Sequence, residues 1–269
     1  MILRSMITAT NTMNQLQKQI DTISHNMSNL DTNGYKKTST SFEELLKQQF
    51  NNQPDEEKEV GRQTDFGIRQ GTGARLTTSM LFSQGPLKQT NRELDVALTK
   101  SNQFLQVDVG GDIRYTRDGA LYLSPTNEGE LMLVTAEGHS VLDANQNPIV
   151  FDEAVKEFTI SPNGTITAIP QNDLAEPQTF ELGVVQINRP DLLVATGSNM
   201  YDLSIVNPEY ITFLERDEIA VQQGALEGSN VDLATEMSDL LVAQRSYQLN
   251  ANSISIGDQM LGLINNVRS

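Results

Sequence analysis

Apolar residues recur with helical spacing at both ends of the chain and with strand spacing between them. Near the N-terminus they step alternately by three and four residues from Met6 to Leu30. This is an a/d heptad pattern, and a helix of about 25 residues spans about 37 Å at ~1.5 Å per residue. Asn33 and Gly34 follow, a pair that favours a left-handed helix stop. The pattern predicts an N-terminal helix with one narrow apolar seam.

The C-terminal end repeats this spacing from Leu233 to Leu261, with polar residues in the seam at Gln244 and Asp258. Residues 229–232 supply capping side chains and a first-turn acid, which predicts a helix start there. The seam positions that we expect to contact other helices are Met13, Leu16, Ile20, Ile23, Met27, Leu30, Leu233, Met237, Leu240, Tyr247, Ile254 and Leu261.

The middle of the chain alternates apolar and polar residues. Leu105, Val107 and Val109 precede the turn pair Gly110-Gly111, and this order predicts a β-hairpin. A second hairpin is predicted around Asn163-Gly164, and a further strand from Phe180 to Val184. The polar segment 48–73, rich in Gln, Asn, acidic residues and Gly, is typical of an extended linker.

We therefore expect an α+β fold in which the N- and C-terminal helices pair as a coiled coil around a β-rich middle domain. The expected divisions are an N-terminal helix at 1–35, an extended linker or insert at 36–92, the β-rich domain at 93–210, a return linker at 211–228, and a C-terminal helix at 229–269.

The sequence alone does not decide which helix packs against each apolar seam. The two helices can pair with each other within one monomer, since a long helix gains most of its stability from tertiary packing. Additional apolar residues lie off the seam, however, at Ile2 and Ile7 near the N-terminus and at Leu241, Leu249, Ile256, Met260, Leu263 and Ile264 near the C-terminus. Two helices cannot cover all of them, which favours further helices from neighbouring subunits. Gln244 and Asp258 are either polar register markers or solvent-facing residues.

Composition narrows the function. The 269 residues carry 35 acidic and 19 basic side chains, a net charge of −16, which argues against binding nucleic acid. The absence of cysteine removes disulfides and thiolate chemistry. We see neither a secretory signal pattern nor an apolar run near the ~20 residues of a membrane span, so we expect any export to proceed without a cleavable signal.

Candidate chemistry is sparse. Residues 143–147 begin like a calcium loop, but Pro148 and Ala154 stand where that loop needs Gly and Glu, so a polar turn is the better interpretation. His25 and His139 are isolated. We expect no catalytic residue, no metal, no cofactor and no small-molecule substrate.

Three stretches resemble the flagellar rod and hook axial proteins. Residues 24–36, SHNMSNLDTNGYK, resemble the family's N-terminal pattern N-N-(apolar)-(A/S)-N-x-x-T-x-G-(F/Y)-K. Residues 228–232, GSNVD, continue through Glu236-Met237 to residues 244–250, QRSYQLN, and resemble its C-terminal pattern. Internal landmarks are QGPL at 84–87, LDVAL at 94–98 and YTRDG at 115–119. One departure is residues 100–105, KSNQFL, where the family has G-x-G-F-F.

The resemblance covers nearly the whole chain, and the length and the insert after Phe42 look most like the distal-rod branch. It implies a structural protein of the bacterial flagellar basal body, exported by the flagellar type III apparatus, that polymerises through its terminal helices and transmits torque to the hook. Its implied partners are copies of itself, the proximal rod and hook proteins, and the export apparatus.

Two points stay open beside the resemblance. Asn26 and Asn29, with Gly34 and Tyr35, either simply terminate the first helix or fix the junction between helix and linker. The rival functions are a monomeric surface adhesin with a closed terminal coiled coil and, more remotely, a carboxylate-dependent glycosidase.

Overall fold

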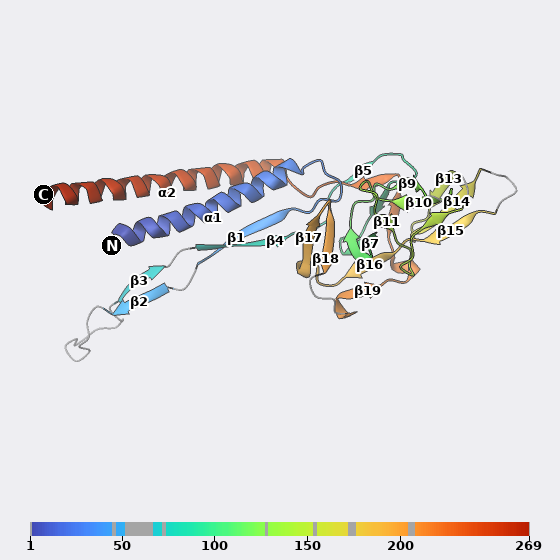
Figure 1. Ribbon diagram of the computed structural model, residues 1–269, viewed down its shortest axis with the longest axis horizontal. Helices are drawn as coiled ribbons and strands as arrows, with labels where there is room; N and C mark the ends of the chain where they lie inside the picture. The colour runs from blue at the N-terminus through green and yellow to red at the C-terminus, as the bar shows by residue number, and fades with distance from the viewer. Residues whose placement is uncertain are drawn as a thin grey trace. The chain divides into compact units, whose positions relative to one another are not determined.

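Two long helices formed by the chain ends and a strand-rich middle make up an α+β fold in the computed structural model (Figure 1). The structure describes residues 2–44, 47–51, 67–71, 74–126, 129–152, 155–171, 176–203 and 208–268. Most of the predicted linker 48–73 lies outside these residues. The chain divides into two units: Met1–Met27, Thr38–Ser79 and Leu233–Ser269 form the first, and Ser28–Lys37 with Met80–Asp232 form the second.

The first unit contains both helices and two strand pairs. Its elements are α1 (Ile2–Ser28), β1 (Thr38–Glu44), β2 (Lys47–Asn51), β3 (Gly67–Gly71), β4 (Ala74–Met80) and α2 (Leu233–Arg268). Strand β1 pairs with β4, and β2 pairs antiparallel with β3. The Gln15 side chain of α1 accepts a hydrogen bond from the Leu76 N–H of β4, so the β1–β4 ribbon packs beside α1. Neither helix, within the described residues, is long and apolar enough to cross a membrane.

Helix α1 ends at Ser28, which is earlier than the predicted stop at Asn33-Gly34. The physical reason lies in the side chain of Asn26, which binds the backbone of Thr38 at the start of β1. The chain must therefore leave the helix within this interval. Gly34, with φ of +69°, serves a later turn, where its N–H donates to the Glu227 carbonyl.

The second unit is built on a ten-stranded sheet. Its strands are β7 (Gln103–Val109), β8 (Asp112–Thr116), β9 (Tyr122–Pro125), β10 (Leu131–Val134), β11 (Ser140–Val141), β12 (Val150–Phe151), β16 (Val184–Ile187), β17 (Leu193–Gly197), β18 (Met200–Leu203) and β19 (Ile211–Phe213). Strand β7 is central, because it pairs with β8, β11 and β16.

Smaller sheets complete this unit. Strands β13 (Val155–Ile160), β14 (Thr165–Pro170) and β15 (Gln178–Glu181) form a three-stranded sheet, and β5 (Leu87–Gln89) and β6 (Val96–Leu98) pair with β21 (Ala225–Glu227) and β20 (Val221–Gln223). Short 3-10 helices occur at η2 (Pro190–Leu192), η3 (Pro208–Tyr210) and η4 (Arg216–Glu218). Residues 211–228, expected to be a return linker, thus contain the strands β19, β20 and β21.

Both predicted hairpins are confirmed. Strands β7 and β8 pair with Val109 opposite Asp112, and Gly110 and Gly111 both have positive φ in the turn between them. Strands β13 and β14 pair with Ile160 opposite Ile166. The single strand predicted from Phe180 to Val184 is wrong: β15 and β16 belong to different sheets, and the chain bends between them.

Two apolar cores follow from the alternation along the central sheet. Leu105 and Val107 of β7 join one core, while Phe104, which precedes them, joins the other. Because successive strand side chains point to opposite faces, these cores lie on the two faces of the sheet. The rings of Phe82, Phe104 and Tyr201 meet edge to face in the second core.

Candidate assembly site

One face of α1 is covered within its unit. Ala9, Leu16 and Ile23, spaced by seven residues, are buried, and Met13, Ile20 and Met27 are half-buried. These positions follow the predicted seam. Leu30, the last position of that seam, lies two residues beyond the helix and is half-buried.

The buried row of helix α2 overlaps the predicted seam only in part. Glu236, Ala243 and Gly257, again spaced in multiples of seven, are its buried positions. Leu240, Tyr247, Ile254 and Leu261 are half-buried, whereas Leu233 and Met237 are exposed. Gln244 and Asp258, each one residue beyond a buried position, are exposed as well.

The buried positions Ala243 and Gly257 carry small or no side chains, while the bulky apolar residues Val242, Leu249, Ile256 and Leu263 of the same helix are exposed. The spacing of apolar residues in the sequence does not show whether a row of small residues or a neighbouring row of bulky residues is the buried one. The predicted positions Leu240, Tyr247, Ile254 and Leu261 are half-buried beside this row, whereas the predicted positions Met237, Gln244 and Asp258 each lie one residue beyond a buried one and are exposed.

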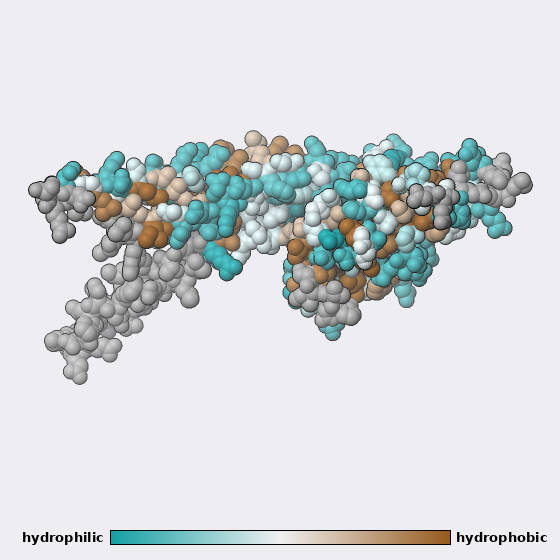
Figure 2. Space-filling view, viewed as in Figure 1, coloured by the Kyte–Doolittle hydropathy of each residue, from teal (hydrophilic) through white to brown (hydrophobic). Residues whose placement is uncertain are grey.

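The bulky apolar residues of α2 form an outward stripe. Val242, Leu249, Ile256 and Leu263 recur every seven residues, so they lie on one face of the helix. With Leu241 and Met260 they make up the stripe, and the exposed fractions of these six residues run from 43% to 67%. Figure 2 shows apolar residues on the surface of the helical unit. An isolated exposed Leu is ordinary, but several bulky apolar residues exposed along one helix indicate an interaction surface.

Asn26 connects three elements of the first unit. Its Oδ1 accepts from the Thr38 N–H at 3.0 Å, and its Nδ2 donates to the Thr38 carbonyl at 2.9 Å. The same Nδ2 donates to Oε2 of Glu236 in the first turn of α2, at 3.1 Å. Asn29 has a local contact, in which it accepts from the Thr32 hydroxyl at 3.2 Å.

A buried ionic cluster lies in the second unit. The sequence patterns did not predict that its three residues are in contact. Lys36 follows α1, Arg117 follows β8, and Glu227 ends β21. Nζ of Lys36 lies 2.7 Å from Oε1 of Glu227, and the Arg117 guanidinium lies 2.6 Å from Oε2. All three side chains have zero exposed surface.

Hydrogen bonds satisfy the rest of this cluster. Arg117 also donates to the carbonyls of Lys100, Ser101 and Gln103, at 2.9, 2.8 and 2.6 Å. The Gly85 N–H donates to Oε1 of Glu227 at 2.8 Å. Buried charges are tolerated only when paired and hydrogen-bonded in this way, so each member depends on the others.

The cluster explains several landmark residues. Lys36 ends the N-terminal pattern, Arg117 lies within YTRDG, and Glu227 precedes GSNVD. Gly85 of QGPL packs against the backbone of Gly228, so a Cβ at this position would overlap the Gly228 carbonyl oxygen. Gly34, also buried in this unit, has the same constraint, since a Cβ there would lie 2.6 Å from the backbone nitrogen of Asp118. Tyr35, beside it, is buried as well.

Burial shifts the pKa values of Lys36 and Asp118, which lie in or beside this cluster. Desolvation lowers the pKa of Lys36 to about 8, with the nearby Arg117 charge acting in the same direction and Glu227 opposing it. Desolvation raises the pKa of Asp118 to about 6, against the hydrogen bond that its carboxylate accepts from the Ala120 N–H.

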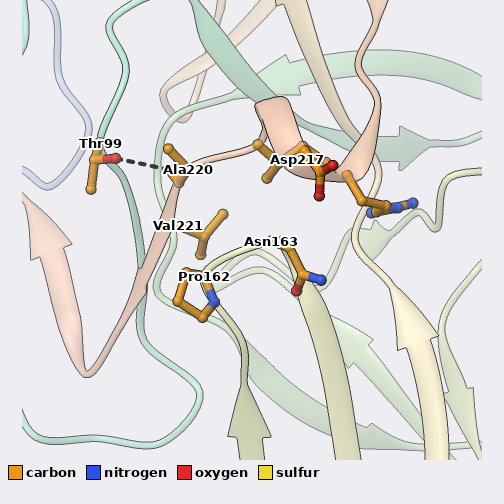
Figure 3. A pocket seen from close by; sticks show the side chains of 8 residues that line it. Thr99, Pro162, Asn163, Asp217, Ala220 and Val221 are labelled. Atoms are coloured by element: carbon orange, nitrogen blue, oxygen red, sulfur yellow. Dashed lines mark hydrogen bonds between the residues drawn. The ribbon is translucent and has the colours of Figure 1, made fainter.

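A shallow pocket of about 380 Å³ lies between η4, β20 and the β13–β14 turn (Figure 3). Thr99 donates to the Ala220 carbonyl at its edge. The Arg216 guanidinium in its lining is 2.7 Å from Glu181 and donates to the Leu182 carbonyl. This cation therefore stabilises the β-rich unit itself.

The residues considered for metal binding form a turn. Oδ1 of Asp143 accepts from the N–H groups of Asn145 and Asn147, at 2.8 and 2.7 Å, as a polar turn requires. In the part of the chain that the structure describes, no three or more His, Asp or Glu side chains gather closely enough to hold a metal ion.

Comparison with known families matches three parts of the chain. Residues 6–36 match "Flagella basal body rod protein", residues 100–168 match the "Flagellar hook protein FlgE/F/G D1 domain", and residues 222–267 match "Flagellar basal body rod FlgEFG protein C-terminal". The matches include the helical ends and the segment that carries Glu227.

Individual relatives cover the chain from end to end. The flagellar hook-basal body complex protein FlhP of Bacillus subtilis is 48% identical, with 99% of this chain and all of the relative aligned. The flagellar basal-body rod protein FlgG of Borreliella burgdorferi is 33% identical over 99% of both chains, and FlgG of Bacillus subtilis is 29% identical over 99% of this chain and all of the relative. These relatives favour an axial protein over a surface adhesin.

Proposed function

The chain belongs to the flagellar basal-body rod protein family, and we propose that it is a structural subunit of the distal rod that assembles through its two terminal helices. In this role it acts in the basal body without catalysis, and it transmits torque towards the hook through contacts between subunits.

The outward apolar stripe of α2 is the observation that carries the proposal. We propose that α1 and α2 pair as a coiled coil, with Leu16 and Ile23 of α1 against the small inward positions of α2. That pairing leaves Leu249, Ile256 and Leu263 facing away, and covering them removes apolar surface from water at about 25 cal/mol per Å². Helices of neighbouring copies are the occupants that we propose.

The domain roles follow from this arrangement. Residues 1–35 and 229–269 would form the axial core, 36–92 the insert that contacts adjacent subunits, and 93–210 the outer β-rich layer, joined to the last helix by 211–228. Proximal rod and hook proteins would be its neighbours, after delivery by the flagellar type III export apparatus.

Incorporation into flagella tests the proposal. Leu249→Asp places a charge in the stripe, while Ser255→Asp places the same charge on an exposed polar position of the same helix. We expect the first variant to be absent from isolated basal bodies and its cells to be non-motile, and the second to be incorporated. Normal motility with Leu249→Asp and Leu263→Asp together would contradict the proposal.

A further inference from the structure

The contact between Asn26 and Glu236 is a polar pair inside an otherwise apolar helical face. Both residues are 1% exposed, and the Nδ2–Oε2 distance is 3.1 Å. The neighbouring buried positions are Ile23 on α1 and Ala243 on α2. Polar atoms of α1 and α2 therefore meet at this level, and the next buried position on each helix is apolar.

The orientation of the Asn26 amide is fixed by the ribbon. Because Oδ1 accepts from the Thr38 N–H and Nδ2 donates to the Thr38 carbonyl, the nitrogen must point where it does. A flipped amide would set an oxygen against the Glu236 carboxylate and leave the Thr38 N–H facing a donor. Asn26 can thus offer only a donor to α2, and it offers it at one height along α1.

Because residues recur every seven positions, the main alternative to the observed alignment is one in which α2 is shifted along α1 by seven residues. If α2 moved by one heptad, Ala243 would take the place of Glu236 at this level. The half-buried residues Leu240, Tyr247, Ile254 and Leu261 recur with the same period, so the shifted helix would present similar apolar side chains to α1. The buried Glu236 carboxylate, however, would lose the hydrogen bond from Asn26, and the loss of a hydrogen bond to a buried charge is costly.

We propose that Asn26 and Glu236 set the axial register of α1 against α2 and couple that register to the start of the β1–β4 ribbon. The inference rests on the helix pairing proposed above and adds the residues that select one alignment. Asn26 acts here as a positioning residue, since it holds two elements through Glu236 and Thr38.

Cysteine cross-linking reads the register directly, because the chain contains no cysteine of its own. Ile20→Cys is combined in turn with Leu240→Cys, Tyr247→Cys or Ile254→Cys, which are half-buried positions of α2 spaced by seven residues. Intrachain disulfide yield is measured in the full-length protein. A hydrogen bond to a charged group should favour one of the three pairs by roughly tenfold over the others.

The same three double-cysteine variants, made with Asn26→Asp in addition, should lose this preference. The new carboxylate at position 26 would then face the carboxylate of Glu236. Adding Glu236→Gln, which supplies a donor from α2 to the new carboxylate at position 26, should partly restore it. Asn29→Asp is the matched control and should leave the preferred pair unchanged. An unchanged preference in the Asn26→Asp background would overturn the register role, as would Glu236→Gln failing to restore it.

The outcomes separate this inference from the proposed function. Absence of every intrachain disulfide in the native background would overturn the register role, while incorporation of the Leu249 variants still tests the outward stripe. Loss of the register preference with normal incorporation would support the inference and show that assembly tolerates more than one alignment.

Discussion

Glu227 and Lys36 are 191 positions apart in the chain, and their Oε1 and Nζ atoms lie 2.7 Å apart with no exposed surface on either side chain. One residue follows the first helix and the other precedes the second. The contact therefore ties the segment after α1 to the segment before α2, with Arg117 as its third member, and the bonds from Gly34 N–H to the Glu227 carbonyl and from Lys37 N–H to Asn230 Oδ1 join the same two segments.

Glu227→Gln should destabilise the β-rich unit strongly. The change leaves two buried cations without their counter-charge, and breaking a buried ionic group in this way costs about 3–5 kcal/mol. Urea unfolding of the full chain, followed by tyrosine fluorescence, measures the loss. Glu157→Gln, at an exposed strand position, should shift the free energy of unfolding by no more than about 0.5 kcal/mol. Equal stability of the two variants would argue against the cluster.

Lys36 should make stability rise with pH above about 8. Its pKa is about 8 in the fold and near 10.5 when exposed, so between these values the unfolded chain binds the proton that the folded chain has released. Unfolding free energy should increase from about pH 8 towards about pH 9.5, by up to about 1.4 kcal/mol per pH unit.

Lys36→Met is the control for this pH dependence, because it roughly keeps the volume and leaves the Arg117–Glu227 pair neutral. Burial raises the pKa values of Tyr115 and Tyr201, which oppose the effect only where unfolded tyrosine ionises, above about pH 10. Parallel stability curves for the native protein and Lys36→Met would show that Lys36 does not cause the rise.

Gly85→Ala should destabilise the chain, because its Cβ would overlap the Gly228 carbonyl. Overpacking of this kind costs about 1–3 kcal/mol when the backbone must shift. Gly262→Ala is the contrasting change, since a Cβ there meets no atom within 4 Å and alanine favours a helix by about 1 kcal/mol. Thermal unfolding of both variants compares them, and a stable Gly85→Ala protein would refute the close backbone contact.

The helices and hairpins could be predicted because their signals are local. Heptad spacing requires only neighbours along the chain, as does the Gly110-Gly111 turn. The segment 211–228 gives no such signal, because its strands are three residues long and gain their order from β5, β6 and β16. Short strands of this kind depend on partners distant in sequence.

The site is harder to predict for the same physical reason. Lys36, Arg117 and Glu227 each belong to or adjoin a landmark stretch, yet nothing in the spacing of charged residues indicates which of them share a buried cluster. The stripe on α2 is predictable as surplus apolar surface. Its orientation required the structure, because Ala243 and Gly257 occupy the covered face.

Cross-linking between copies in isolated basal bodies tests the central claim most directly. A single Leu249→Cys or Ile256→Cys change introduces the chain's only thiol, and a short bifunctional maleimide then joins thiols that face each other across subunits. The account predicts dimers and higher multimers from both stripe variants, and mostly monomer from Glu157→Cys on the β-rich unit. Stripe variants that incorporate normally and stay monomeric would contradict assembly through the outward face of α2.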